Sequence, residues 1–124
     1  MARVLVADDD DASRLLVVTL LKYAGHQAVE ASDGAAVLAA VDEASPDLLV
    51  IDLSMPGLSG SEVIQRLRRS GARLPIALYT ATQVNDAMRD FMAMYDVRTA
   101  IPKPSDPREL LAAVELSLSS RANR

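Results

Sequence analysis

Three aspartates directly follow two apolar segments of the chain. Asp8 and Asp9 come after residues 4–7, and Asp52 comes after residues 48–51. Apolar runs without alternation are typical of strands buried on both faces, as in a parallel sheet covered by helices. In open α/β sheets, ligands bind just outside the carboxyl ends of the strands. Asp52 therefore occupies a position where such folds do their chemistry. Taken alone, it fits a solvated strand-end residue or a helix cap nearly as well.

A hydroxyl and an ammonium group follow later strands in the same way. Thr80 ends an expected strand over 75–80, and Lys103 follows one over 97–101. Because the ends of parallel strands share one edge, these residues can converge with the aspartates. Carboxylates packed together repel one another unless a cation is bound, and hard oxygen ligands suit magnesium. A carboxylate nucleophile, a magnesium ion, a lysine and a hydroxyl together predict a phosphoryl-transfer site.

Strand-like and helix-like patterns alternate along the whole chain. We expect strands over 4–7, 26–31, 48–51, 75–80 and 97–101, and helices over 13–23, from the turn at 32–34 to 44, 61–70, 84–95, and from the cap at 106–109 to 118. Crossovers between parallel strands are right-handed, so such a sheet needs helices on both faces. The pattern predicts a doubly wound α/β fold, a three-layer sandwich of five strand–helix units.

Several side chains have structural interpretations. Ser13 is predicted to cap the first helix, after the helix-start residues Asp10 and Asp11. Three residues of this helix lie at helical spacing: Leu16, Leu20 and Tyr23. A second stripe favours core over a binding groove: Met88, Phe91, Met92 and Tyr95. Arg66, Arg68 and Arg69 indicate a solvated helix face, and His26 is expected to be structural or exposed.

Composition excludes several kinds of function. The 124 residues contain no cysteine and one histidine, which excludes disulfides and thiolate metal sites and argues against zinc. The net charge of −4 argues against direct nucleic-acid binding. No segment is apolar enough to predict a membrane span or membrane association, so we expect a soluble, cytoplasmic domain.

Four motifs, in order at the expected strand ends, resemble those of the receiver domains of two-component response regulators. They are residues 4–10 (VLVADDD), Asp52 with Met55-Pro56 and Gly60, Thr80-Ala81, and Lys103-Pro104. The resemblance covers essentially the whole chain. It implies the flavodoxin-like (βα)5 fold with strand order 2-1-3-4-5.

The resemblance also implies a role for each site residue. Asp52 would be the phosphoacceptor, and Asp9, Asp52 and the Ser54 main-chain carbonyl would bind Mg2+ directly, with Asp8 acting mainly through water. Thr80 would follow the phosphoryl group, and Lys103 would pair with it. In this family the Lys-Pro peptide at 103–104 is often cis. The domain would catalyse only its own phosphorylation and dephosphorylation, so it is not classed as an enzyme.

One position departs from the family pattern. Receivers usually carry a Tyr or Phe three residues before the lysine, where this chain has Ala100. An alternative function is therefore a receiver-like protein-binding scaffold whose output is independent of phosphorylation. Tyr95 is a candidate substitute for the missing ring. A third candidate, an aspartyl-nucleophile phosphohydrolase, is disfavoured because such enzymes generally place a second Asp where this chain has Ser54.

The resemblance also implies partners and a domain boundary. A histidine kinase or histidine phosphotransfer protein would supply the phosphoryl group, and an effector protein or output domain would respond to it. Homodimers formed through the last two strand–helix units are common in the family. We assign residues 1–118 to the receiver domain. Residues 119–124 are predicted to be a C-terminal tail or the start of a linker, because apolar periodicity ends at Leu118.

Overall fold

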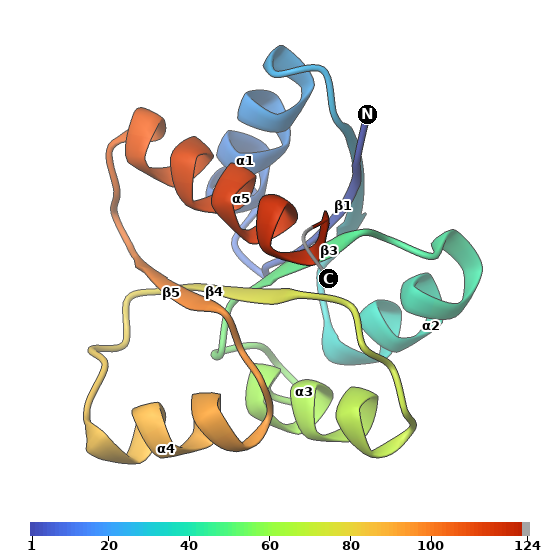
Figure 1. Cartoon of the computed structure of the whole chain (residues 1–124), viewed down its shortest axis with the longest axis vertical. Helices are drawn as coiled ribbons and strands as arrows, with labels where there is room; N and C mark the ends of the chain where they lie inside the picture. Colours follow the sequence, from blue (N-terminus) through green and yellow to red (C-terminus); the bar gives the residue numbers. More distant parts are fainter. Residues whose placement is uncertain (123–124) are drawn as a thin grey trace.

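A computed structural model describes residues 1–122, in which five strands and five helices alternate (Figure 1). The strands are β1 (Arg3–Ala7), β2 (Gln27–Ala31), β3 (Leu48–Ile51), β4 (Ile76–Thr80) and β5 (Thr99–Pro102), and the helices are α1 (Asp11–Tyr23), α2 (Gly34–Ala44), α3 (Gly60–Arg69), α4 (Asp86–Met94) and α5 (Pro107–Ala122). No helix within residues 1–122 is both long and apolar enough to cross a membrane.

The strands form one parallel sheet in the order β2-β1-β3-β4-β5. Helices α1 and α5 cover one face, and α2, α3 and α4 cover the other (Figure 1). The predicted fold class and strand order are therefore confirmed.

The continuous apolar runs are explained by burial on both faces of the sheet. All four residues of β3 are buried. In β1, Leu5 packs into the core under α2 and α3, while Val4 and Val6 pack into the core under α1 and α5. A polar face on either strand would leave unpaired polar groups inside the protein.

The predicted cap of α1 is wrong, and the three apolar residues noted at helical spacing are not the ones that the helix buries. Asp10, not Ser13, is the N-cap, and its carboxylate accepts a hydrogen bond from the Ser13 N–H at 3.1 Å. The buried residues are Val17, Val18 and Leu21. Of the three residues noted at helical spacing, Leu16 and Tyr23 are exposed and Leu20 is half-buried. Both sets have helical spacing, and the period alone does not fix which stripe faces the sheet.

The later elements agree with the predictions apart from their ends. Helix α4 begins after an Asn85 cap rather than at Val84, and β5 starts at Thr99 rather than Val97. The predicted stripe of α4 does face the core, although none of its residues is fully buried. Helix α5 continues through residues 119–122 of the predicted tail, and residues 123–124 lie outside the described residues. The predicted domain boundary at 118 stays a prediction.

His26 was expected to be structural or exposed, and the structure gives it a structural role. The residue precedes β2, and its Nδ1 accepts a hydrogen bond from the Ala2 N–H at 3.3 Å. Its Nε2 lies 2.7 Å from a Glu115 carboxylate oxygen. The ring therefore links the N-terminus to α5.

The prediction that the arginines of α3 form a solvated face is wrong for Arg68. Its Nε donates to the Tyr95 carbonyl at 2.7 Å, and its Nη2 donates to the Asp96 carbonyl at 3.0 Å. Its Nη1 donates to the carbonyls of Leu74 and Ala72, at 2.8 and 3.1 Å. One guanidinium thus joins the loop after α3 to the loop after α4.

Removing this guanidinium should destabilise the protein. We expect Arg68→Ala to lower the free energy of unfolding by about 2 kcal/mol, because four carbonyl oxygens lose a charged donor. Arg68→Lys should recover only part of the loss, since an ammonium lacks the planar fork. Denaturant unfolding measures both. Arg69→Ala, on the exposed side of the same helix, is the control, and an equal loss there would contradict the assignment.

Candidate functional site

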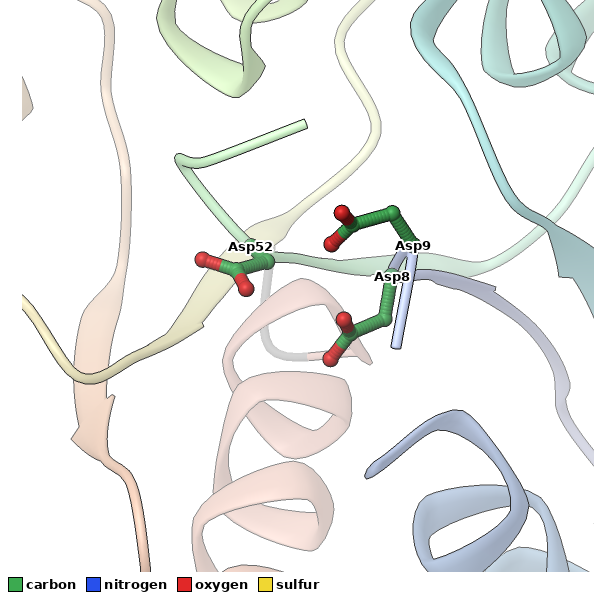
Figure 2. A group of neighbouring side chains, drawn as sticks. All are labelled: Asp8, Asp9 and Asp52. Atoms are coloured by element: carbon green, nitrogen blue, oxygen red, sulfur yellow. The ribbon is translucent and has the colours of Figure 1, made fainter. Parts of the chain in front are cut away.

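The pairing of β1 with β3 places the aspartates together. Ala7 is in register with Ile51, and the Asp52 N–H donates to the Ala7 carbonyl at 3.0 Å. The side chains that follow, from Asp8 and Asp52, lie at the same edge of the sheet (Figure 2). One carboxylate oxygen each from Asp8, Asp9 and Asp52 lies within 4.8 Å of the others. Asp8 and Asp52 are buried, at 2% and 8% exposure, and Asp9 is exposed.

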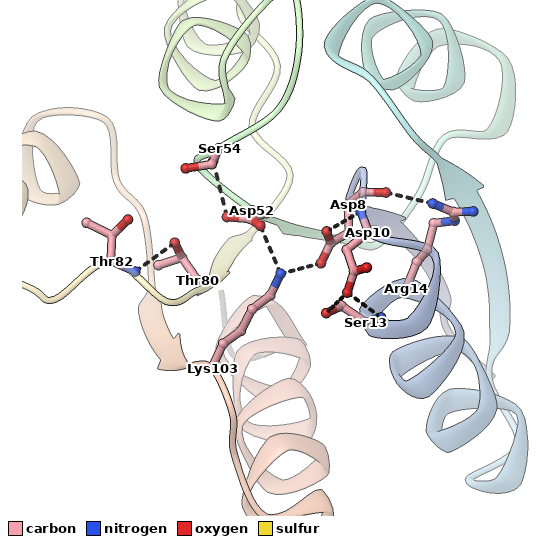
Figure 3. A network of polar contacts seen from close by, with 9 residues as sticks. All are labelled: Asp8, Asp10, Ser13, Arg14, Asp52, Ser54, Thr80, Thr82 and Lys103. Carbon is pink, nitrogen blue, oxygen red and sulfur yellow. Dashed lines mark hydrogen bonds and ion pairs between the residues drawn. The ribbon is translucent and has the colours of Figure 1, made fainter.

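Lys103 reaches this cluster from the loop after β5. Its Nζ donates to Asp8 Oδ2 at 2.6 Å and to Asp52 Oδ2 at 2.8 Å (Figure 3). The Lys103–Pro104 peptide is cis, as the resemblance implies. The ammonium also lies 5.2 Å from the centre of the Tyr79 ring. One cation therefore bridges the two buried carboxylates.

The electrostatics of the site follow from this bridge. Burial lowers the pKa of Lys103, but its hydrogen bonds to Asp52 and Asp8 outweigh this, and the net pKa lies above the ordinary value. Burial raises the pKa of the neighbouring Tyr79 hydroxyl. The folded protein therefore stabilises the charged form of Lys103.

Thr80 and Ser54 complete the set of predicted residues. Thr80, the last residue of β4, is buried, and its hydroxyl accepts a hydrogen bond from the Thr82 N–H at 3.2 Å. The Ser54 N–H donates to Asp52 Oδ1 at 3.1 Å (Figure 3). The structure thus gathers every predicted site residue at one edge of the sheet. The role of the Ser54 carbonyl stays a prediction.

Sequence reasoning missed Arg14, which supports the acidic loop. Its Nη1 donates to the Asp8 carbonyl at 2.8 Å. Its other nitrogens pair with Asp11 at 2.7 Å and Glu30 at 3.0 Å, and these hydrogen bonds raise the pKa of the guanidinium. A cation in the first turn of a helix opposes the helix dipole. That mismatch, beside a run of four aspartates, is the signal that could have identified it.

Gly60 fixes the loop that follows Asp52. A Cβ at this position would lie 2.3 Å from the Asp52 carbonyl oxygen, closer than atoms pack. The Gly60 N–H donates to the Leu53 carbonyl at 2.9 Å. The first turn of α3 therefore packs directly on the backbone that carries Asp52.

The departure at Ala100 is visible in the structure. Ala100 lies in β5 opposite Leu78 and contacts the core under α3 and α4. Tyr95 caps the far end of α4, and its ring centre lies 4.9 Å from that of Phe91. Tyr95 does not line the space beside Thr80. No aromatic side chain among the described residues takes the usual place.

The fold and the acidic edge define a flavodoxin-like α/β domain with a cluster of three carboxylates at the strand ends. Residues 4–115 match the family model for the response regulator receiver domain. The chain belongs to this receiver-domain family. The match gives no support to the alternative of a phosphorylation-independent scaffold.

Curated relatives include two full-length regulators. The chain is 37% identical over 121 residues to the DNA-binding dual master transcriptional regulator RpaA of Synechocystis sp., covering 95% of this chain and 49% of that protein. It is also 37% identical over 118 residues to response regulator MprA of Mycobacterium leprae, covering 94% of this chain and 50% of that protein. The chain therefore spans about half the length of the curated relatives it matches.

Solved structures confirm the fold. Chemotaxis protein CheY4 of Vibrio cholerae superposes with a TM-score of 0.87 at 27% identity, covering 94% of this chain and 98% of that one. A CheY-like receiver domain from Methanospirillum hungatei superposes with a TM-score of 0.90 at 21% identity, covering 99% and 98%.

The raised pKa of Lys103 predicts how the contribution of this residue to the free energy of unfolding varies with pH. In the unfolded chain, Lys103 titrates near the ordinary value of about 10.4. Its stabilisation is therefore complete below that pH and is lost as pH rises through the higher pKa of the folded protein.

We expect Lys103→Met to lower the free energy of unfolding by on the order of 2 kcal/mol near pH 8, because two buried carboxylates lose their partner. The difference in free energy of unfolding between the variant and the parent should become smaller above about pH 10.4. Denaturant unfolding from pH 8 to 11 measures this difference, with Lys22→Met at an exposed position of α1 as the control. A difference in free energy of unfolding that grows at high pH would contradict the predicted direction.

Proposed function

We propose that Asp52 accepts a phosphoryl group from a phosphohistidine of a partner protein. The observation that carries the proposal is the buried Asp52 carboxylate, within hydrogen-bond distance of Lys103 and close to Asp8 and Asp9. An Asp52 oxygen would attack phosphorus as the P–N bond to the donor imidazole breaks and its electron pair returns to the ring nitrogen. Lys103 would transfer its pairing to the phosphoryl oxygens, and the Thr80 hydroxyl would donate to one of them.

The carboxylates fit a bound Mg2+ ion. Three oxygens within 4.8 Å, with no sulfur or imidazole ligand among them, form the hard donor set that magnesium prefers. Asp9, Asp52 and the Ser54 carbonyl would hold the ion directly, and Asp8 would hold it through water. When bound, the ion offsets negative charge on the phosphoryl oxygens. Asp8 and Arg14 would keep the loop in place, through the Arg14 hydrogen bond to the Asp8 carbonyl.

The partners follow from this chemistry. The phosphodonor would be a histidine kinase or a histidine phosphotransfer protein, and transfer from such a donor would take place in the cytoplasm. The domain would catalyse its own phosphorylation and dephosphorylation and would change its contacts with an effector protein or output domain. A homodimer through the last two strand–helix units is one arrangement for that output. RpaA is named a DNA-binding regulator, and this chain covers 49% of that protein.

Phosphorylation is tested with a small phosphodonor. Incubation with acetyl phosphate and Mg2+ should add one phosphoryl group, and Asp52→Asn should abolish it because an amide is not a nucleophile. Intact mass spectrometry measures the product. Asp42→Asn, a change at an exposed carboxylate on α2, is the matched control. An unmodified parent protein, or a phosphorylated Asp52→Asn, would overturn the proposal.

Magnesium binding is tested by stability without any phosphodonor. A ligand at one hundred times its Kd stabilises the folded state by about 2.7 kcal/mol. We expect Mg2+ to give such a gain to the parent, and Asp9→Asn to lose more than half of it by removing a direct ligand. Denaturant unfolding with and without Mg2+ measures the gain, with Asp42→Asn as control. A gain retained in full by Asp9→Asn would remove Asp9 from the ligand set.

A further inference from the structure

The pairing of β4 with β5 brings an aromatic ring beside Lys103. Tyr79 lies opposite Ile101 in the register, and both residues pack into the core under α1 and α5, so they lie on one face of the sheet. The Lys103 N–H donates to the Thr80 carbonyl at 3.0 Å, so the pairing continues one residue beyond β5. Lys103 follows Ile101 by two residues, the spacing that returns a side chain to the same face. The ring of Tyr79 and the stem of Lys103 are therefore neighbours.

The ring is fixed by the core, whereas the lysine is not. Tyr79 is 4% exposed and belongs to the set of buried residues that α1 and α5 enclose against the sheet. Side chains in a close-packed core hold a single arrangement. Lys103 lies on the loop after β5, and its ammonium is at the end of a flexible four-carbon stem. A packed ring can therefore restrict the position of this ammonium without being ordered by it.

Two carboxylates do not use all the donors of the Lys103 ammonium. It carries three N–H groups, and two of them have acceptors in Asp8 Oδ2 and Asp52 Oδ2. Within residues 1–122, the third N–H has no hydrogen-bond acceptor. Nζ lies over the Tyr79 ring, 5.2 Å from the ring centre, and the Lys103 side chain is only 15% exposed. A cation within about 6 Å of an aromatic face is attracted by it, and more strongly where water is excluded.

We propose that Tyr79 is a positioning residue, whose ring holds the Lys103 ammonium at the Asp52 carboxylate. A ring suits this task because its face attracts the ammonium and carries no net charge. A third carboxylate in the same place would add to the repulsion between Asp8 and Asp52. It would also compete with an incoming anion for the ammonium. The ring therefore restricts the lysine while leaving its charge available to the site.

The consequence for phosphoryl transfer rests on the proposed function, whereas the hold of the ring on Lys103 does not. A cation that already lies where negative charge develops needs no reorganisation at the moment of reaction. Lys103 would exchange its hydrogen bond to Asp52 for one to a phosphoryl oxygen while it stays over the ring. Without the ring, the stem can take rotamers that carry the ammonium away from the site. Loss of the ring should therefore slow transfer to Asp52.

The hold of the ring is tested by proton NMR on the chain without Mg2+ or phosphodonor. The chain has two lysines, Lys22 and Lys103, so their ε-methylene signals can be told apart. An aromatic ring shifts the signals of protons above its face upfield. The Lys103 signals should therefore lie upfield of those of the exposed Lys22 in the parent and in Tyr79→Phe, which keeps the ring, and Tyr79→Leu should remove this shift. Unshifted Lys103 signals in the parent, or an unchanged shift in Tyr79→Leu, overturn the proposal.

The effect on transfer is tested with acetyl phosphate and Mg2+, and intact mass measures the rate. Tyr79→Leu should slow phosphorylation about five-fold, the size of one desolvated cation–π contact, and Tyr79→Phe should stay within about two-fold of the parent. Val114→Ala, which opens a cavity in the same core on α5, is the control for lost packing. It should keep the parental rate and the parental Lys103 signals. A parental rate in Tyr79→Leu, or an equal loss in Tyr79→Phe or Val114→Ala, overturns the positioning role.

The two readouts separate failure of the ring from failure of the proposed function. A parent that takes no phosphoryl group overturns the proposed function and the effect on its rate, while the Lys103 signals still decide whether the ring holds the ammonium. A phosphorylated parent, with Tyr79→Leu reacting at the same rate, leaves the proposed function intact and overturns Tyr79 as a positioning residue. Denaturant unfolding shows that each variant is folded. Tyr79→Met, an unbranched apolar side chain that adapts to irregular gaps, replaces Tyr79→Leu if the latter does not fold.

Discussion

Two carboxylates at the ends of paired parallel strands are the constraint on which the rest of this structure depends. The register of β1 with β3 fixes Asp8 beside Asp52. Both side chains are buried against the apolar strands, so the carboxylates cannot move apart into solvent. Like charges so close and so buried repel strongly, and Lys103 offsets that repulsion by bonding to both. The same arrangement holds the proposed nucleophile, the proposed Mg2+ ligands and the ammonium group that would pair with a phosphoryl oxygen.

The elements on the two sides of this cluster differ in how many contacts support it. On the side of β1, Arg14 ties the acidic loop to α1 and β2, and Gly60 lets α3 pack against the backbone of Asp52. On the side of β4, residues 81–87 are exposed and the wall beside Thr80 is hollow. The carboxylates therefore lie at a well-supported edge of the sheet, while the adjoining segment 81–87 has little buried surface to hold it.

Helix α4 shows the same contrast along its own length. Its C-terminal end is fastened by Arg68, which donates to the carbonyls of Tyr95 and Asp96. Its N-terminal end follows the open wall of the hollow. The two ends of this helix are therefore held by different contacts, four hydrogen bonds from Arg68 near one end and the Asn85 cap at the other. In this chain, Ala100 lines the hollow beside Thr80.

The sequence by itself determined the strands, their order in the sheet and which polar side chains meet at its edge. Unbroken apolar runs ending in Asp8, Asp52 and Thr80 have one stable arrangement, a parallel sheet covered on both faces, which brings those ends together. Tertiary structure alone decided which stripe of α1 is buried, because helical spacing fits Leu16 and Leu20 as well as Val17 and Leu21. It also decided that Arg68 binds four carbonyls and that Ala100 borders a hollow. Contacts between distant segments have no periodicity in the sequence, so only the packed fold reveals them.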